Sequence, residues 1–184
     1  DKNKILQEYS KANCTYANTV VSKTAGAKFA DYSQNELSHL PDDVTKHSFG
    51  CGNPLSFSEV KAGQVVVDLG CGAGLDLLLA SEMVGNSGHV IGVDFNEDML
   101  ALADQRTSEY KNIELRKGII EKLPIESNSV DWVISNCVIN LSENKQQAFK
   151  EIARVLKPSG RMIVSDIVAE KLPRWVVHSG VLKA

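Results

Sequence analysis

Short apolar runs alternate with longer amphipathic stretches along the chain from residue 65 onward. Five of the segments have the length of strands: 65–69, 89–94, 113–117, 130–135 and 161–166. Turn residues lie between them. Strands that alternate with helical stretches are typical of an α/β domain. The pattern therefore predicts an α/β fold with a mainly parallel sheet.

Two helices are expected between the first three strands. The first would cover residues 75–84, because Gly85 follows as a C-terminal glycine stop. The second would begin after Asn96, which is a favourable N-cap residue. Glu97 and Asp98 would then lie in its first turn, where the positive end of the helix dipole stabilises carboxylates.

A third helix is expected before the last strand. Ser142 is a suitable N-cap, and apolar residues recur behind it at intervals of three and four. These residues are Phe149, Ile152, Ala153 and Leu156. They predict one apolar helix face that packs on the sheet. The tetrapeptide Lys-Pro-Ser-Gly at 157–160 would end the helix and turn the chain into the last strand.

The N-terminal third of the chain has a different character, because it contains few apolar runs. Residues 5–12 and 41–50 are compatible with short helices, the second of which would start at Pro41. We therefore expect an N-terminal helical cap over residues 1–60 and an α/β core over residues 61–184.

The most informative segment joins the first predicted strand to the first predicted helix. It reads Val-Val-Val-Asp-Leu-Gly-Cys-Gly-Ala-Gly at 65–74. Glycines let a ligand approach the backbone closely, and the amides at a helix start favour anionic groups. The dinucleotide fingerprint would require a third glycine where this chain has Leu75. A nicotinamide-dependent oxidoreductase is therefore the least favoured interpretation, whereas a tight turn without a ligand stays open.

Asp94 closes the second predicted strand. Its carboxylate could accept two hydrogen bonds from the hydroxyl groups of a ribose, and a local role at the start of the next helix is the alternative. Together, the glycine turn and Asp94 resemble the class I S-adenosylmethionine-dependent methyltransferases, over about residues 60–168. In that family an acid at the position of Asp94 binds the ribose hydroxyls of the cofactor.

The resemblance implies a doubly wound, Rossmann-like sheet with helices on both faces, and S-adenosylmethionine as the cofactor. Gly70, Gly72 and Gly74 would line the methionine and ribose part of that cofactor. Asp68 would lie near its amino group, and Met99 would pack near the adenine.

A third loop, Gly-Ile-Ile-Glu at 118–121, departs from the family pattern. Many members have an acid directly after this glycine to bind the adenine amino group, whereas this chain has Ile119. The resemblance then implies that the adenine contact passes to the backbone around Ile120 and to Glu121.

Two further segments resemble the arsenite methyltransferases. One is Ser-Asn-Cys-Val-Ile-Asn-Leu at 135–141, and the other is Ser-Phe-Gly-Cys-Gly-Asn-Pro at 48–54. This resemblance implies that Cys51 and Cys137 are the catalytic residues that bind trivalent arsenic, with Cys14 as a candidate third ligand. It also places Asn136 among the cofactor contacts.

The chemistry of sulfur agrees with that resemblance, because soft thiolates select soft, thiophilic centres. Arsenic held by thiolates has a lone pair that can attack a sulfonium methyl group in line, so no general base is required. The resemblance implies arsenite or its thiol conjugate as substrate and a thiol reductant as partner. Free cysteines are also often buried, so packing roles for Cys51 and Cys137 stay open, and Cys71 is expected to be structural.

Composition and charge exclude several classes of protein. The chain has 184 residues, of which 43% are hydrophobic and 23% charged, and this argues against disorder and against a pure coiled coil. Its net charge of -3 makes nucleic acid an unexpected partner. No apolar stretch approaches the roughly 20 residues that span a bilayer, and the first residues are too polar for a signal peptide. We therefore expect a cytoplasmic protein without a membrane partner, whose cysteines are thiols.

Two other functions stay open on the residues alone. One is a small-molecule O-, C- or N-methyltransferase with structural cysteines, and the other is a non-catalytic module that holds the cofactor. The family pattern continues beyond the fifth strand with further strands and another cysteine, whereas this sequence has no cysteine after Cys137. We therefore expect a core that lacks its C-terminal strands.

Overall fold

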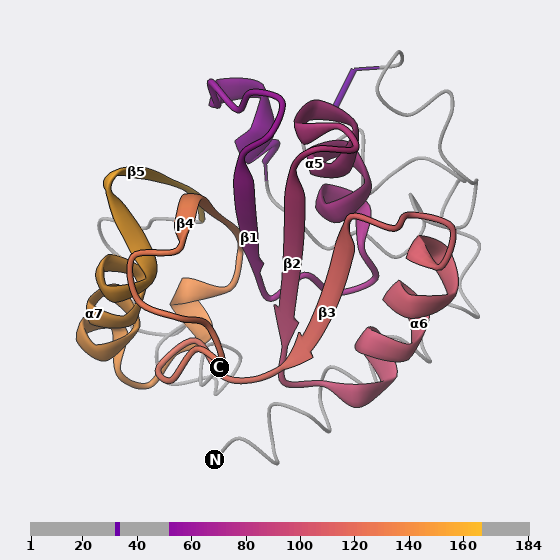
Figure 1. Ribbon diagram of the computed structural model, residues 1–184. Coiled ribbons are helices and arrows are strands. Elements are labelled where there is room, and N and C mark those ends of the chain that lie inside the picture. The colour runs from indigo at the N-terminus through magenta and orange to yellow at the C-terminus, as the bar shows by residue number, and fades with distance from the viewer. Residues whose placement is uncertain (1–31, 34–51, 167–184) are drawn as a thin grey trace. The chain divides into compact units, whose positions relative to one another are not determined.

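The computed structural model describes residues 32–33 and 52–166, and every structural statement below concerns these residues (Figure 1). In chain order the elements are η1 (Pro54–Phe57), β1 (Val65–Leu69), α5 (Leu75–Val84), β2 (His89–Asp94), α6 (Glu97–Thr107), β3 (Ile113–Lys117), β4 (Val130–Asn136), η2 (Ile139–Leu141), α7 (Lys145–Val155) and β5 (Leu156–Ser165). Most of the predicted cap over 1–60 and the segment 167–184 lie outside the described residues, whereas residues 52–60 of the cap, which contain η1, and the predicted boundary at 61 lie within them.

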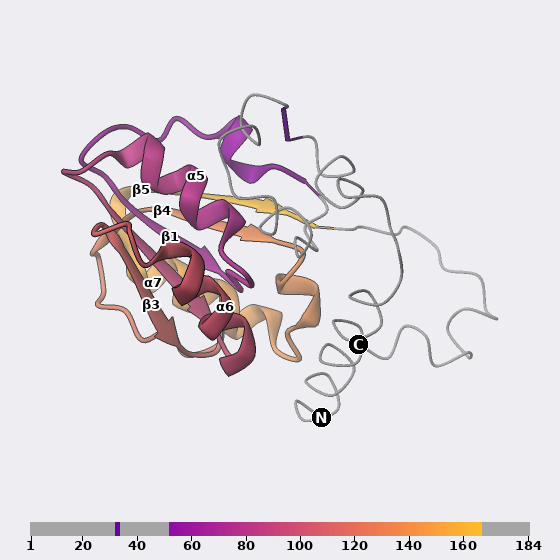
Figure 2. The ribbon, with the colours of Figure 1, turned by 90° about the vertical axis from the view of Figure 1, so that its right-hand side faces the viewer.

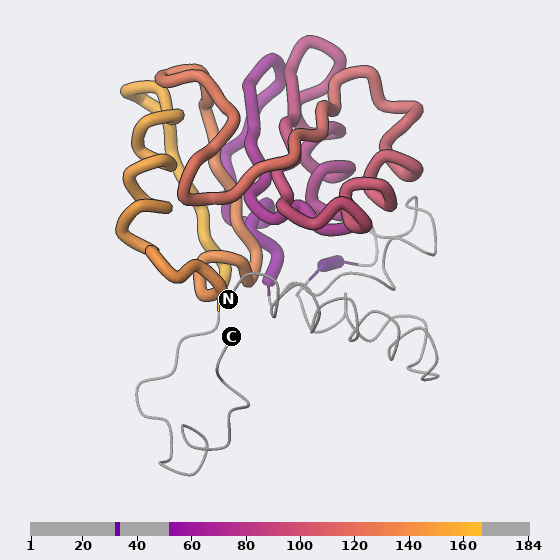
Figure 3. Tube along the Cα trace, turned by 90° about the horizontal axis from the view of Figure 1, so that it is seen from below, coloured from indigo at the N-terminus to yellow at the C-terminus, as the bar shows by residue number. Residues whose placement is uncertain are grey.

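The five strands form one parallel sheet in the order β3-β2-β1-β4-β5. The order reverses at β1, which pairs with β2 on one side and with β4 on the other. In open α/β sheets, ligands bind outside the carboxyl ends of the strands at such a switch point. The strand arrows of β2 and β3 point to this edge in Figure 1, and Figure 3 looks onto it.

Helices cover both faces of the sheet (Figure 2). On one face α5 packs its leucines on β1, β2 and β4 in a core with α6 alongside; this core includes Val66, Leu77, Leu78, Val90, Trp132 and Ile134. On the other face α7 packs on the same strands through Ile152 and Val155. Alternate residues of each buried strand therefore pack into the two cores on opposite faces of the sheet. This arrangement confirms the predicted doubly wound α/β fold.

The first two predicted helices are confirmed, and the third differs in its start and in its buried face. Asn144 is the N-cap of α7, because its side chain accepts a hydrogen bond from the Gln147 N–H at 3.0 Å. The buried positions of α7 are therefore Ala148, Ile152 and Val155. The prediction that Ser142 caps the helix was wrong, and Phe149, assigned to the apolar face, is 41% exposed.

The last strand begins earlier than predicted. Residues 157–160 were expected to form a turn, but β5 starts at Leu156, directly after α7. The pairing of β4 with β5 shifts in register between Val130 and Trp132. A proline is tolerated in a strand where such an irregularity makes its missing N–H unnecessary, and Pro158 lies in this part of β5.

None of the helices that the structure describes is long and apolar enough to cross a bilayer.

Candidate cofactor and thiol site

The glycine turn between β1 and α5 forms the centre of the site. Gly70 has a φ of 67°, in the left-handed region that favours glycine. Its N–H donates to the Val93 carbonyl at 2.7 Å, so the turn is fastened to β2. A Cβ at Gly70 would lie 2.3 Å from Cγ2 of Val138. Glycine is thus required here both by backbone conformation and by the close approach of the loop that follows β4.

Gly72 and Gly74 leave space next to the backbone. Gly72 has a φ of 50°, and a Cβ there would meet nothing closer than the Gly70 carbonyl oxygen at 4.0 Å. Gly74 is the N-cap of α5, with a φ of 92° and no capping side chain. A helix start without a side-chain cap presents its backbone N–H groups to a ligand.

The Asp94 carboxylate connects the glycine turn to the start of α6. Its Oδ2 accepts a hydrogen bond from the Gly72 N–H at 2.9 Å, and its Oδ1 accepts one from the Asn96 N–H at 2.9 Å. Burial raises the pKa of Asp94, and the backbone donors Asn96, Gly72 and Phe95 oppose that rise. Each carboxylate oxygen has a second lone pair, so a diol could still bind at this position, as the resemblance implies.

Asp68 is the most deeply buried acid of the site, with 2% of its surface exposed. Burial, followed by the negative charges of Asp76 and Asp94, raises its pKa well above the ordinary value. Among the described residues, no hydrogen-bond donor offsets this rise of the Asp68 pKa. Carboxylates gathered in this way favour a cationic ligand. S-adenosylmethionine carries an ammonium and a sulfonium group, so the residues present fit this cofactor.

The predicted adenine contacts lie along the next two loops. Met99 is 4% exposed in the first turn of α6, where the Asn96 side chain caps its N–H at 3.4 Å. Ile120 is 9% exposed. The Glu121 carboxylate accepts a hydrogen bond from the Ser142 hydroxyl at 2.8 Å, which ties this loop to the segment before α7. The structure thus brings these loops to the edge of the sheet that carries Asp94.

Cys137 directly follows β4 and has a φ of 58°, which is uncommon for a residue other than glycine. Its N–H donates to the Ser165 carbonyl at 2.8 Å, at the end of β5. Cys137 is disulfide-bonded in the structure, so the expectation that all the cysteines are thiols was wrong for this residue. Non-glycine residues in the left-handed region cluster at functional sites, and the role of Cys137 as an arsenic ligand stays a prediction.

The other cysteines fall into two groups. Cys71 is free and 7% exposed. Burial and the neighbouring charges of Asp68 and Asp94 raise the pKa of its thiol, so it stays a protonated packing residue. Cys14 and Cys51, the other two predicted arsenic ligands, lie outside the described residues.

Sequence analysis missed two residues that contact this site. The Tyr32 hydroxyl donates to Oδ1 of Asp76 at 2.6 Å, and the Asn136 side chain donates to both residues at 3.2 Å. Burial and the adjacent Asp76 charge raise the pKa of Tyr32, so the phenol stays protonated. A lone acid in the apolar run Leu-Asp-Leu-Leu-Leu at 75–79 was a signal for Asp76, whereas no local pattern marks Tyr32.

The parallel sheet, the glycine turn and the acids at its switch point define a class I methyltransferase domain with S-adenosylmethionine as its cofactor. A family model described as a methyltransferase domain matches residues 60–182, and the chain belongs to this family. A crystal structure of an S-adenosylmethionine-dependent methyltransferase from Aquifex aeolicus has 28% identity and a TM-score of 0.59. The match covers 83% of this chain and 78% of the Aquifex aeolicus protein.

Two arsenic-related proteins are more similar to this chain. The arsenite methyltransferase of Halobacterium salinarum is 40% identical over 149 residues, which are 80% of this chain and 38% of that protein. The crystal structure of CrArsM, an arsenic(III) S-adenosylmethionine methyltransferase from Chlamydomonas reinhardtii, has 36% identity and a TM-score of 0.72. The match covers 82% of this chain and 54% of CrArsM. The chain thus spans about two fifths of the length of the curated relatives that it matches.

Proposed function

We propose that this domain transfers a methyl group from S-adenosylmethionine to trivalent arsenic held by the thiolates of Cys51 and Cys137, with Cys14 as a candidate third ligand. The observation that carries the proposal is the contact between the loop after β4 and the glycine turn. Val138, which follows Cys137, packs so closely on Gly70 that a methyl group there would be 2.3 Å from its Cγ2. The thiol-bearing loop and the cofactor turn are therefore adjacent.

The residues of the chain need to perform only binding and positioning in this reaction. S-adenosylmethionine, when bound, would supply an electrophilic methyl group on a sulfonium sulfur, which would keep the electrons of the sulfur–carbon bond when the arsenic lone pair forms the new bond to that carbon. The thiolates hold the arsenic, and the acids Asp68 and Asp94 offer charge and hydrogen-bond acceptors at the cofactor end. Positioning of this kind can account for about 7–11 kcal/mol of a barrier in favourable cases.

Two observations support arsenic as the methyl acceptor. Both similar proteins described above are named for arsenic methylation. Cys137, in the segment that resembles the arsenite methyltransferases, lies in the loop that packs on the glycine turn. Soft thiolates select soft, thiophilic centres such as trivalent arsenic. We further propose a thiol reductant as partner, to keep these thiols reduced, and a cytoplasmic location.

The proposal is tested by incubating the purified, reduced protein with arsenite, a thiol reductant and methyl-labelled cofactor. Labelled methylarsenicals, separated by chromatography, are the expected products. Cys137→Ser should abolish them, whereas the matched control Cys71→Ala should still bind arsenic with wild-type stoichiometry, because its thiol is buried and protonated. Undiminished methylation by Cys137→Ser would exclude the arsenic assignment. Arsenite-independent labelling of another small molecule would indicate an O-, C- or N-methyltransferase instead.

A further inference from the structure

The side chain of Asn136 forms a reciprocal pair with the backbone of Gly52. Its Nδ2 donates to the Gly52 carbonyl at 2.7 Å, and the Gly52 N–H donates to its Oδ1 at 3.3 Å. A carboxamide has the same donor and acceptor pattern as a peptide group, so this pair replaces the two bonds that neighbouring strands would make. The end of β4 is thereby joined to a segment 84 positions earlier in the chain.

The orientation of the Asn136 carboxamide follows from its surroundings. Its Nδ2 also lies 3.2 Å from the Tyr32 hydroxyl oxygen and 3.2 Å from Oδ2 of Asp76. The opposite orientation would place Oδ1 against the Gly52 carbonyl oxygen and the Asp76 carboxylate, where oxygen faces oxygen. Three acceptors for two N–H groups use the full donor capacity of this amide. The protein itself therefore engages this side chain.

Two buried residues, Tyr32 and Asp76, contact the Asn136 side chain and hold it in place. Tyr32 and Asp76 are each 7% exposed, and the Tyr32 hydroxyl donates to Asp76. Asp76 lies in the first turn of α5, where the helix dipole stabilises its carboxylate. Asn136 is thus fixed against a helix end that also borders the cofactor turn.

Ser165 gives a second, independent sign that the two segments are held closely together. A Cβ at Gly52 would lie 2.0 Å from the Ser165 Oγ. The carbonyl of the same Ser165 accepts the hydrogen bond from the Cys137 N–H at 2.8 Å. The end of β5 therefore contacts both segments, and only glycine fits at position 52 without a shift of Ser165.

The covalent neighbours of this pair are the two proposed arsenic ligands. Cys137 directly follows Asn136, and Cys51 directly precedes Gly52 in the sequence. We propose that the Asn136 carboxamide is a positioning group, which fixes the backbone beside Cys137 to the backbone beside Cys51 and so sets the spacing of the two thiols. This inference rests on the proposed function and replaces the expected cofactor contact of Asn136 with a role at the acceptor site.

Preorganisation is the physical reason for such a group. Two thiols bind one arsenic atom more tightly when their spacing is set before binding, because less conformational freedom is lost. A misplacement of about 1 Å can cost about a hundredfold in a reaction that depends on position. Loss of the pair should therefore weaken bidentate arsenic binding far more than it changes the reactivity of either thiol alone.

The test compares a bidentate with a monodentate thiol probe on the reduced full chain. The bidentate probe is a trivalent phenylarsenical, which bridges two thiols, and the monodentate probe is iodoacetamide. Asn136→Leu should weaken phenylarsenical binding about 10- to 100-fold while the alkylation rate of Cys137 stays within about twofold. Asn136→Ser, which is shorter and cannot reach Gly52, should weaken binding similarly, and it serves as the measured variant if Asn136→Leu does not fold.

The matched control is Asn144→Ala, which removes an asparagine that caps α7. It should lower the thermal midpoint and leave phenylarsenical affinity unchanged. Wild-type affinity in a folded Asn136 variant would overturn the positioning role while the arsenic assignment stands. Failure of the wild type to bind the phenylarsenical, or equal binding by Cys137→Ser, would instead overturn the proposed function itself.

Discussion

Acidic residues at the two ends of the parallel sheet have pKa values that are shifted in opposite directions. At the carboxyl end, burial raises the pKa of Asp68 and of Asp94. At the amino end, Glu114 accepts hydrogen bonds from Arg116 and lies 3.2 Å from the His89 ring, and these contacts lower its pKa to about 2. Burial thus sets the direction of the pKa shift for these acids at one end of the sheet, and hydrogen bonds from Arg116 set it for Glu114 at the other.

Polar groups at the amino end are used for structure. A groove there is lined in part by Ser81, Gly85, His89 and Asn112. The Asn112 side chain donates to the carbonyls of Ser81 and Gly85 at 3.3 and 3.0 Å, and it accepts from the Ser81 hydroxyl at 2.8 Å. These bonds fasten the end of α5 to the start of β3, so their polar groups are satisfied within the fold.

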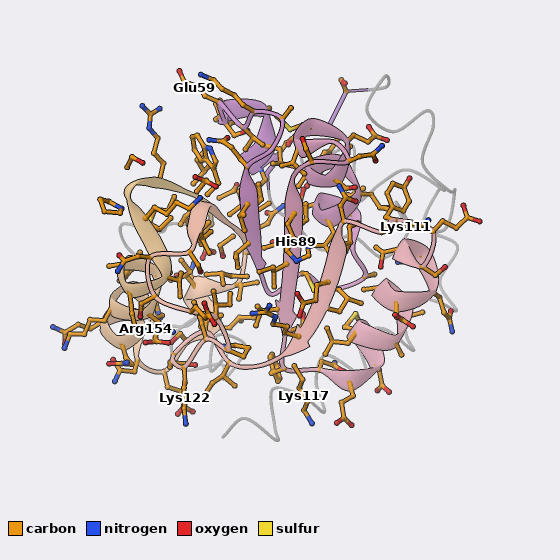
Figure 4. The ribbon with its side chains drawn as sticks, viewed as in Figure 1. Glu59, His89, Lys111, Lys117, Lys122 and Arg154 are labelled. Atoms are coloured by element: carbon orange, nitrogen blue, oxygen red, sulfur yellow. The ribbon has the colours of Figure 1, made fainter. Side chains whose placement is uncertain are left out.

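Charged side chains at the periphery of the domain form ion pairs, as Glu114 does at the amino end of the sheet. Figure 4 shows Lys117, Lys122 and Arg154 at the outside of the domain. Arg154 bonds Glu151 and lowers the pKa of that carboxyl. Only the buried acids of the carboxyl end have raised pKa values among the described carboxyls with a resolved shift. Buried acids with raised pKa values that gather at one edge of a sheet indicate a ligand site.

The largest effect is expected from a methyl group at Gly70. Gly70→Ala would strain the left-handed backbone by about 1–2 kcal/mol and clash with Val138, which adds about 1–3 kcal/mol. Gly63→Ala, at the amino end, has a φ of 83° but meets only Ser87 Oγ at 3.6 Å, so it should show the backbone strain alone. Urea unfolding of both variants measures the difference.

A second substitution identifies the source of that difference. Val138→Ala in the Gly70→Ala background should recover part of the lost stability, because it removes the clashing side chain. Equal losses for Gly63→Ala and Gly70→Ala would show that the approach of the Val138 loop does not constrain the turn, and would weaken the comparison between the two ends.

The next effect concerns the cofactor. Asp94→Asn replaces one of the two acceptor oxygens with a donor, so either the Gly72 N–H or the Asn96 N–H loses its partner. The substitution also removes an oxygen proposed to accept a ribose hydroxyl, and hydrogen bonds to charged groups contribute about 1.5–3 kcal/mol, so S-adenosylmethionine affinity should fall at least about tenfold in calorimetry. Asn112→Ala, the control at the amino end, should lower stability and leave that affinity unchanged. A cofactor affinity that responds to both variants equally would contradict the division of roles.

Local sequence signals predicted most of the fold. The strands at 65–69, 89–94 and 113–117 have the predicted bounds. The first two are buried parallel strands, which appear as apolar runs in the sequence. The start of α7 was not predictable in this way. Ser142 and Asn144 are both good caps, and the Ser142 hydroxyl instead bonds Glu121, 21 positions earlier. A tertiary contact therefore decided between two equally suitable residues.

The residues of the candidate site also differ in whether the local sequence could identify them. Asp94 and the glycine turn were identifiable, because strand, turn and helix follow one another within 65–74 and the acid ends the next strand. The contact of Tyr32 with Asp76 spans 44 positions and the Asn136 pair with Gly52 spans 84. Long-range contacts of this kind leave no periodicity, so the role of Asn136 could be inferred only from the structure.

A smaller effect, with a defined pH dependence, is expected for Asp68→Asn. The folded-state pKa of Asp68 lies above its ordinary value of 3.8. Protonation therefore favours the folded state, and stability is lost as pH rises above that ordinary value. The asparagine variant lacks this loss, so it should be more stable than the wild type near pH 7, with a difference that shrinks toward pH 3. Thermal unfolding at both pH values measures this, and a less stable variant at neutral pH would show that Asp68 is not a source of repulsion.

The smallest effect is expected at the amino end, from Glu114→Gln. The side chain is 45% exposed and its partner Arg116 is 30% exposed, so solvent screens the pair and its loss should cost less than about 1 kcal/mol. Because the pKa of Glu114 is lowered from 4.5 to about 2, this contribution is present above pH 4.5 and disappears as pH falls through about 2. Urea unfolding at neutral pH, with and without added salt, should show a small difference that salt removes. A loss as large as that of Gly70→Ala would mean that the paired end of the sheet contributes as much as the end that carries the site.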